Sequence, residues 1–138
     1  MNWLVSHLSN INWLAVGVVT IVSFPLGALW HNKKLFGKAW AEDAKSSIDT
    51  SNKAAVIRLF SLTALFHFVA VIGLAIAVGN NTTALTGMIT GFFISAAWIS
   101  TSIGVTYMFV GRPFRLILID AGFYIVYFSI AGSILGAW

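Results

Sequence analysis

The stretch AAVIRLFSLTALFHFVAVIGLAIAV, residues 54–78, decides the fold class, because Arg58 is its only charged side chain. About 20 apolar residues in a helix cross the ~30 Å hydrocarbon core of a bilayer. Three other apolar stretches of similar length accompany it, at residues 11–30, 84–110 and 116–138. The sequence therefore predicts an all-α integral membrane four-helix bundle, with residues 1–138 forming a single transmembrane domain.

The composition excludes a soluble globular domain. Hydrophobic residues make up 59% of the 138-residue chain and charged residues only 9%, whereas soluble domains carry roughly 25% charged residues. The chain has no cysteine, which excludes disulfide scaffolds, thiolate metal sites and thiol-based redox enzymes.

The basic residues predict how the chain is oriented. All eight of them lie in or beside the first and third connections between the predicted spans: Lys33, Lys34, Lys38, Lys45, Lys53, Arg58, Arg112 and Arg115. Connections that retain Lys and Arg face the cytoplasm. We therefore expect an integral membrane protein with both termini outside the cytoplasm. The expected partners of the basic loops are anionic lipids of the inner leaflet, and not nucleic acid.

Two short helices are expected outside the spans. The first ten residues show apolar side chains at helical spacing, which predicts a short interfacial N-terminal helix. In the first cytoplasmic loop Trp40, Ala44 and Ile48 recur every four residues, opposite Glu42 and Asp43. This spacing predicts an amphipathic helix that lies in the membrane interface.

Two oppositely charged residues lie inside the spans at similar depth. Arg58 and Asp120 are each about five residues from the cytoplasmic end of a span, which is roughly 7 Å at ~1.5 Å per residue. Charged side chains at such depth are costly and need a partner. The sequence thus offers a candidate intramembrane ion pair. In the alternative, Arg58 extends to the headgroups and Asp120 accepts a hydrogen bond from Tyr107 or Arg115, with a purely structural role.

His67 falls near the middle of its span, where its side chain must face protein or water. Thr63 shares its helical face, one turn away, and other polar or amphipathic side chains reach a similar depth. The candidate intramembrane polar site consists of His67, Tyr127, Thr63, Trp98 and Ser95. Such a site can hold a small ligand or relay a proton. The alternative is a buried neutral histidine that bonds a neighbouring helix and only stabilises packing.

Nothing in the sequence indicates catalysis or a cofactor. Asp120 is the only carboxylate within a span, so paired-carboxylate chemistry is not available. The three histidines lie at different depths and cannot converge on a metal. We therefore predict no catalytic residues, no metal and no cofactor, and we favour a protein that is not an enzyme.

Small residues recur at four-residue spacing on two spans. Gly87, Gly91 and Ser95 do so on the third span, and Gly132 and Gly136 on the fourth. Such faces let helices approach closely. They serve either as seams inside the bundle or as contacts between subunits of a homo-oligomer.

Two stretches resemble the domain-of-unknown-function family 1761. The first comprises Asn12 to Val16 followed by GALWHNKKLFGKAW, residues 27–40. The second runs from Phe109 through GRPFRLILIDAGFYIV to the terminal ILGAW. The resemblance implies a small four-span bacterial membrane protein without an assigned role, for which the expected location is the inner membrane. The family usually has tyrosine at the position of His31, and asparagine and a Tyr–His pair near Asp120, Phe123 and Tyr124.

Two functions fit these features. The first is a non-enzymatic module that interacts with lipids or small molecules, or an accessory subunit of a larger membrane complex. The second is a small homo-oligomeric transporter or channel, with the polar residues around His67 at the midplane of the membrane lining the path.

Overall fold

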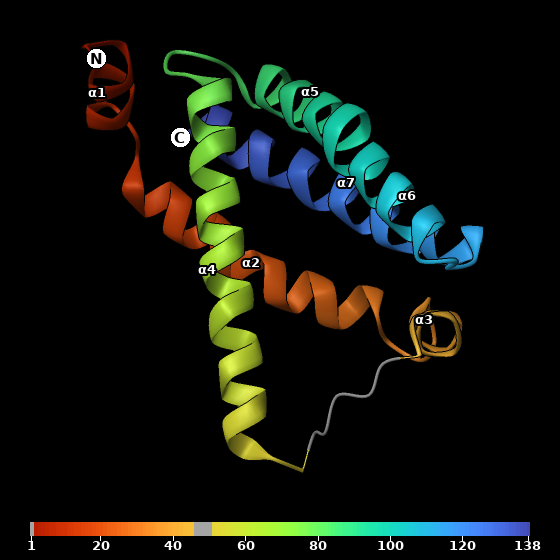
Figure 1. The fold of residues 1–138 in the computed structure, drawn as a ribbon. Coiled ribbons are helices and arrows are strands. Elements are labelled where there is room, and N and C mark those ends of the chain that lie inside the picture. Colours follow the sequence, from red (N-terminus) through yellow and green to blue (C-terminus); the bar gives the residue numbers. More distant parts are fainter. Residues whose placement is uncertain (1, 46–50) are drawn as a thin grey trace.

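The computed structural model describes residues 2–45 and 51–138 and is helical throughout its ordered elements (Figure 1). The elements are α1 (Asn2–Ser9), α2 (Trp13–Trp30), α3 (Gly37–Ala44), α4 (Lys53–Val78), α5 (Ala84–Ile94), a π-helical turn η1 (Ser95–Ile99), α6 (Ser100–Phe109) and α7 (Phe114–Ala137). Four segments are long and apolar enough to cross a membrane: α2, α4, α5 with η1 and α6, and α7. The predicted all-α class with four spans is confirmed, and each end lies within two residues of its predicted position.

Three of the spans begin at a side-chain cap. The side chains of Asn12, Asn52 and Thr83 accept hydrogen bonds from backbone N–H groups three residues ahead, at 3.1, 3.1 and 3.2 Å. These bonds satisfy N–H groups that have no partner within the helix. The fourth span, α7, instead follows Pro113, which has no N–H group to satisfy.

The two predicted short helices are present as α1 and α3. Helix α3 ends at Ala44, and Ile48, the third residue of the predicted amphipathic pattern, lies outside the described residues. On the acidic side of α3, Asp43 contacts Arg115 of α7, as described below. Helix α3 is therefore docked on α7.

The tightest helix pair is α5 with α7, which lie side by side in Figure 1. A Cβ atom at Gly87 would collide with the carbonyl oxygen of Gly132, and one at Gly91 with that of Phe128. A Cβ atom at Gly136 would likewise collide with the carbonyl oxygen of Thr83. The small residues of both spans thus form a seam inside the protomer, which was one of the two roles predicted for them.

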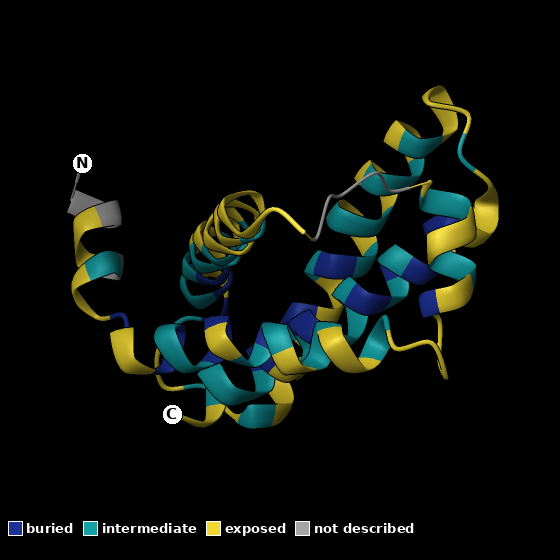
Figure 2. Cartoon of the chain, turned by 90° about the horizontal axis from the view of Figure 1, so that it is seen from below, coloured by how far each residue is buried: buried dark blue, intermediate teal, exposed yellow. Residues whose placement is uncertain are grey.

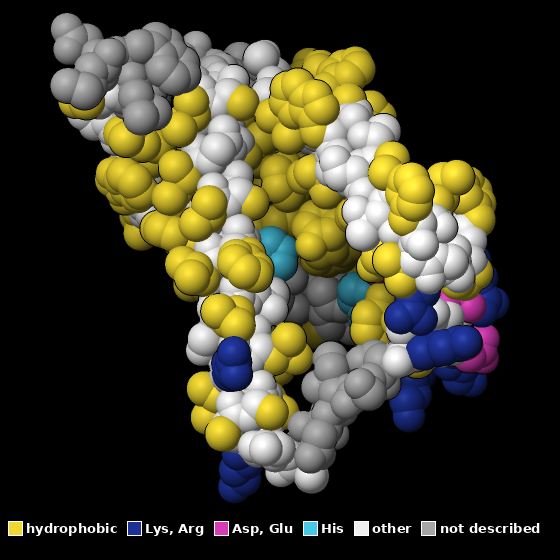
Figure 3. Space-filling model, viewed as in Figure 1, with side chains coloured by type: hydrophobic (Ala, Val, Ile, Leu, Met, Phe, Trp, Pro, Cys, Tyr) yellow, Lys and Arg dark blue, Asp and Glu magenta, His cyan; other side chains and the backbone are white. Residues whose placement is uncertain are grey.

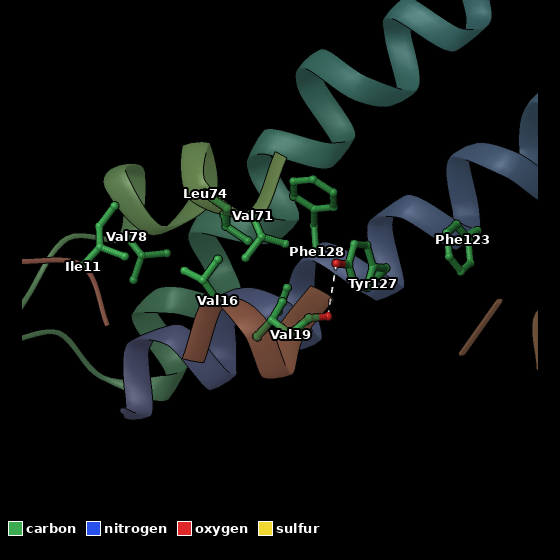
Figure 4. Close-up of a cluster of buried hydrophobic side chains, with 10 residues drawn as sticks. Ile11, Val16, Val19, Val71, Leu74, Val78, Phe123, Tyr127 and Phe128 are labelled. Atoms are coloured by element: carbon green, nitrogen blue, oxygen red, sulfur yellow. Dashed lines mark hydrogen bonds between the residues drawn. The ribbon is translucent and has the colours of Figure 1, made fainter. Parts of the chain in front are cut away.

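The apolar core lies where α2, the second half of α4 and α7 meet (Figure 4). It consists of Ile11, Val16, Val19, Val71, Leu74, Val78, Phe123, Tyr127, Phe128 and Ala131. In α4 only Val71, Leu74 and Val78 are buried, all in the half that leads to α5. The other half of α4 is mainly exposed (Figure 2), as expected for a surface that faces lipid.

The start of α2, the α4–α5 connection and the end of α7 lie together. Asn10, Asn12, Asn81 and Trp138 line one polar cavity of about 440 Å³. The opposite end of the molecule carries α3 and the α6–α7 turn, which are linked by a hydrogen bond of 3.4 Å from Arg112 to the backbone oxygen of Asp43. The four spans therefore alternate in direction and return the chain to the end from which it started.

Candidate functional site

His67 lies at the middle of α4 and is held by its own helix. Its Nδ1 lies 3.1 Å from the carbonyl oxygen of Thr63, one turn earlier. The hydroxyl of Thr63 in turn donates to the carbonyl oxygen of Leu59 at 2.9 Å. The Nε2 atom of His67 is buried and has no hydrogen-bond partner among the described residues, a condition shared there only by the Ser100 hydroxyl. An unpaired polar atom in an apolar interior is costly.

Two cavities meet at His67 and Thr63. The first, of about 620 Å³, lies between α2, α4 and α7. The second, of about 560 Å³, lies between α4, the η1–α6 segment and α7. Figure 3 shows the surface hollowed between α4 and the other helices, with histidine side chains in cyan on the walls. Both cavities are within the ~300–1,000 Å³ that small-molecule sites occupy.

The cavity walls are mostly apolar and aromatic. Phe24, Phe60 and Phe123 line the first cavity, and Phe66, Trp98, Tyr124 and Phe128 line the second. The walls can therefore make extensive contact with the apolar part of a ligand, and they carry few polar groups that would orient it.

Tyr127 supports His67 without lining either cavity. Its ring meets the His67 imidazole edge to face, with centroids 5.1 Å apart, and stacks on Phe123 at 5.9 Å. Its hydroxyl donates to the carbonyl oxygen of Val19 at 3.3 Å, and the side chain is fully buried. Tyr127 therefore fixes the imidazole ring of His67 against α7. The hydroxyl hydrogen of Tyr127 is already bonded to Val19 of α2 (Figure 4).

Ser95 and Trp98 both lie in the π-helical turn η1, but their side chains have different surroundings. The Ser95 hydroxyl donates to the carbonyl oxygens of Gly91 and Phe92 at 2.8 and 2.9 Å and is fully buried. Trp98, three residues later, lines the second cavity. Single π-helical turns are frequent at functional sites. Of the predicted polar site, the structure thus brings His67, Thr63 and Trp98 to one cavity, places Tyr127 behind it and keeps Ser95 apart.

Asp120 is the centre of a second polar cluster, one side of which borders the first cavity. Its Oδ1 accepts a hydrogen bond of 2.9 Å from the indole N–H of Trp40, and its Oδ2 one of 2.8 Å from the Tyr107 hydroxyl. The Nε2 atom of His31 lies 3.8 Å from Oδ1. The cluster therefore joins α3, α6, α7 and the end of α2.

His31 connects this cluster to the first cavity, which it lines. Its Nδ1 lies 3.0 Å from the carbonyl oxygen of Gly27. The neighbouring Asp120 carboxylate raises the pKa of His31, against the opposing effect of burial. The protonated form of His31 is therefore favoured by its place beside Asp120.

The structure does not bring Arg58 and Asp120 together. Asp120 is bonded by Trp40 and Tyr107 instead, and Arg58 has an exposed position on α4 without an ion-pair partner among the described residues. The Tyr107 hydrogen bond was part of the alternative derived from the sequence. Trp40 and His31 were not anticipated as neighbours of Asp120, because no short-range pattern connects residues 80 and 89 positions apart.

A surface ion pair holds α3 on α7. Arg115 donates two hydrogen bonds to the Asp43 carboxylate, at 2.6 and 2.8 Å, and one of 3.1 Å to Glu42. The guanidinium of Arg115 lowers the pKa of Asp43. This bidentate contact fixes the position of Trp40 relative to Asp120.

Among the described residues no group of three or more His, Cys, Asp or Glu side chains could hold a metal ion. The comparisons with known proteins gave one family. A family model described as a protein of unknown function, DUF1761, matches residues 14–136, nearly the whole chain. No curated protein and no solved structure gives a significant match.

Proposed function

Because the chain belongs to the DUF1761 family, whose function is unknown, we propose its function from the geometry around His67. The protein is a non-enzymatic membrane module that binds a small apolar molecule or a lipid in the cavities between α4 and the rest of the bundle. One observation carries this proposal: two cavities of about 620 and 560 Å³ share Thr63 and His67 on their walls.

The surroundings of the cavities support a ligand that arrives through the bilayer. The half of α4 beside them exposes large apolar side chains, with Phe60 and Phe66 at 54% and 69% exposure. Both phenylalanines also line the cavities, Phe60 the first and Phe66 the second. A lipid-soluble molecule can therefore move from the acyl chains to His67 along a continuous apolar surface. The same surface disfavours the entry of a water-soluble molecule.

Filling the cavities tests the proposal. Ala28 lines the first cavity and Ala70 the second, whereas Ala54 is exposed on α4 and lines neither. The wild-type protein, released gently from its membrane, should retain a small molecule or lipid at fixed stoichiometry in native mass spectrometry. Ala28→Phe and Ala70→Phe should lose it, and Ala54→Phe should keep it. Equal retention by all four proteins would contradict the proposal.

A second candidate, a transporter, is favoured by the arrangement of the two cavities. They lie on opposite sides of α4 and meet at the same two residues, which gives a small solute a route past His67. Flux across liposomes that depends on His67 and requires more than one copy of the chain would favour transport. Binding without flux would favour the module.

We also propose that the protein resides in a bacterial inner membrane with both termini outside the cytoplasm. The retention of all eight basic residues around two connections supports this orientation, with anionic inner-leaflet lipids as neighbours. A membrane-impermeant thiol reagent applied from outside should label a cysteine at Asn81 and spare one at Lys34. The reverse pattern would invert the orientation.

A further inference from the structure

The tautomer of His67 follows from its neighbour on α4. A backbone carbonyl oxygen only accepts hydrogen bonds, so the 3.1 Å contact with Thr63 requires the hydrogen of the neutral ring to sit on Nδ1. The second ring nitrogen, Nε2, then carries a lone pair and no hydrogen. It is the atom that is buried without a partner. His67 thus presents a hydrogen-bond acceptor that has no donor among the described residues.

The neutral form of His67 is supported by its surroundings. Among residues 2–45 and 51–138, no carboxylate forms an ion pair with it. Asp120 is bonded by Trp40 and Tyr107. A charged imidazole at the middle of a span without a counter-ion is costly.

The described cavity walls favour neutral ligands. Among residues 2–45 and 51–138, no Lys, Arg, Asp or Glu lines either cavity. On these walls a carboxylate or phosphate group would meet no cation except His31, whose charge is balanced by Asp120 3.8 Å away. An ammonium group would meet no carboxylate on the same described walls. A neutral donor attached to an apolar body is what remains.

We propose that the ligand of these cavities is an apolar molecule carrying a hydroxyl group, such as a lipid alcohol or a phenol, which donates a hydrogen bond to Nε2 of His67. This inference rests on the proposed ligand-binding function and specifies its chemistry. Because Nε2 is covered in the present conformation, binding includes a shift of the imidazole ring or of an aromatic neighbour. Tyr124, whose ring centroid is 6.3 Å from that of His67 and which lines the second cavity, is the neighbour placed to move.

Two matched probes test the hydroxyl requirement. 4-Hexylphenol and 4-hexylanisole have similar shape, and only the phenol has an O–H donor. The full chain is labelled with ¹⁵N-histidine and placed in lipid nanodiscs. The phenol should then shift the Nε2 resonance of His67. It should also bind about tenfold more tightly than the anisole, which is the gain expected from one neutral hydrogen bond. The anisole should bind without shifting that resonance.

Variants of His67 separate the hydrogen bond from packing. His67→Phe should bind both probes with equal affinity, because the ring volume remains and the acceptor is lost. His67→Gln, whose amide oxygen can accept, should retain part of the preference and guards against failure of the phenylalanine variant to fold.

Each outcome decides between two claims. Equal affinity of wild-type protein for phenol and anisole would overturn the hydroxyl inference and leave the ligand-binding function in place. Tighter binding of 4-hexylbenzoate than of the phenol would overturn the inference that His67 is a neutral hydrogen-bond acceptor. Failure of all three probes to bind would contradict the proposed function itself.

Discussion

Replacing Asp120 should reveal how much the cluster of Trp40, Tyr107 and His31 stabilises the fold. The carboxylate accepts hydrogen bonds of 2.9 and 2.8 Å, and its side chain is only 13% exposed. Asp120→Leu leaves the indole N–H of Trp40 and the Tyr107 hydroxyl without an acceptor. At about 1–3 kcal/mol for each unpaired buried group, and with partial access to water, the cost is roughly 2–4 kcal/mol. For a chain of this length that lowers the melting temperature on the order of 10 °C.

Asp120→Asn should cost only about 1 kcal/mol, because the amide oxygen still accepts from Trp40 and the amide nitrogen can donate to the tyrosine oxygen. The assay is thermal unfolding of purified protein in one detergent. Tyr107→Phe completes a double-mutant cycle with Asp120→Leu. It should destabilise the wild-type protein by about 1 kcal/mol and the Asp120→Leu protein by almost nothing. Equal melting temperatures for Asp120→Asn and Asp120→Leu, or an undiminished cost of Tyr107→Phe when it is combined with Asp120→Leu, would refute the reasoning.

Two further perturbations follow from the packing and the charges. Gly87→Ala should destabilise the protein by about 1–3 kcal/mol, because its Cβ atom meets the Gly132 carbonyl, whereas Gly73→Ala, with no atom within 4 Å of the new Cβ atom, should be neutral or stabilising in the same melting assay. The pKa of His31 is raised in the folded protein, so its pairing with Asp120 stabilises fully below its unfolded pKa of about 6.5, and that contribution is lost as the pH rises through the folded value. Melting temperature should therefore fall over this range, and His31→Gln should flatten the profile; an unchanged slope in the variant would assign the effect to another group.

The spans could be predicted because their signals are local. Runs of apolar residues predicted the four helices that the structure confirms. The seam of Gly87 and Gly132 was also readable, because four-residue spacing places small side chains on one helical face.

The partners of Asp120 could not be predicted, because they come from distant parts of the chain. Depth alone put Arg58 level with Asp120, but depth leaves the azimuth of each helix undetermined. In the structure α4 turns Arg58 outward, and α3 brings Trp40 to the carboxylate instead. The missing signal was the Asp43–Arg115 contact, which docks α3 on α7 across 72 residues.

The predicted polar site was only partly assembled for a related reason. Thr63 and His67 share a face by helical spacing, but Ser95 and Trp98 both lie within a π-helical turn, where the spacing rules for an α-helix do not hold. Ser95 consequently bonds its own helix and Trp98 reaches the cavity.

A cryo-electron microscopy structure of the protein in nanodiscs of its native lipid tests the central claim most directly. We expect both cavities beside Thr63 and His67 to be open, with density for a bound molecule in one or both of them and within hydrogen-bond distance of the His67 imidazole. Closure of both cavities, with Nε2 of His67 bonded by a protein side chain, would contradict the proposed binding site.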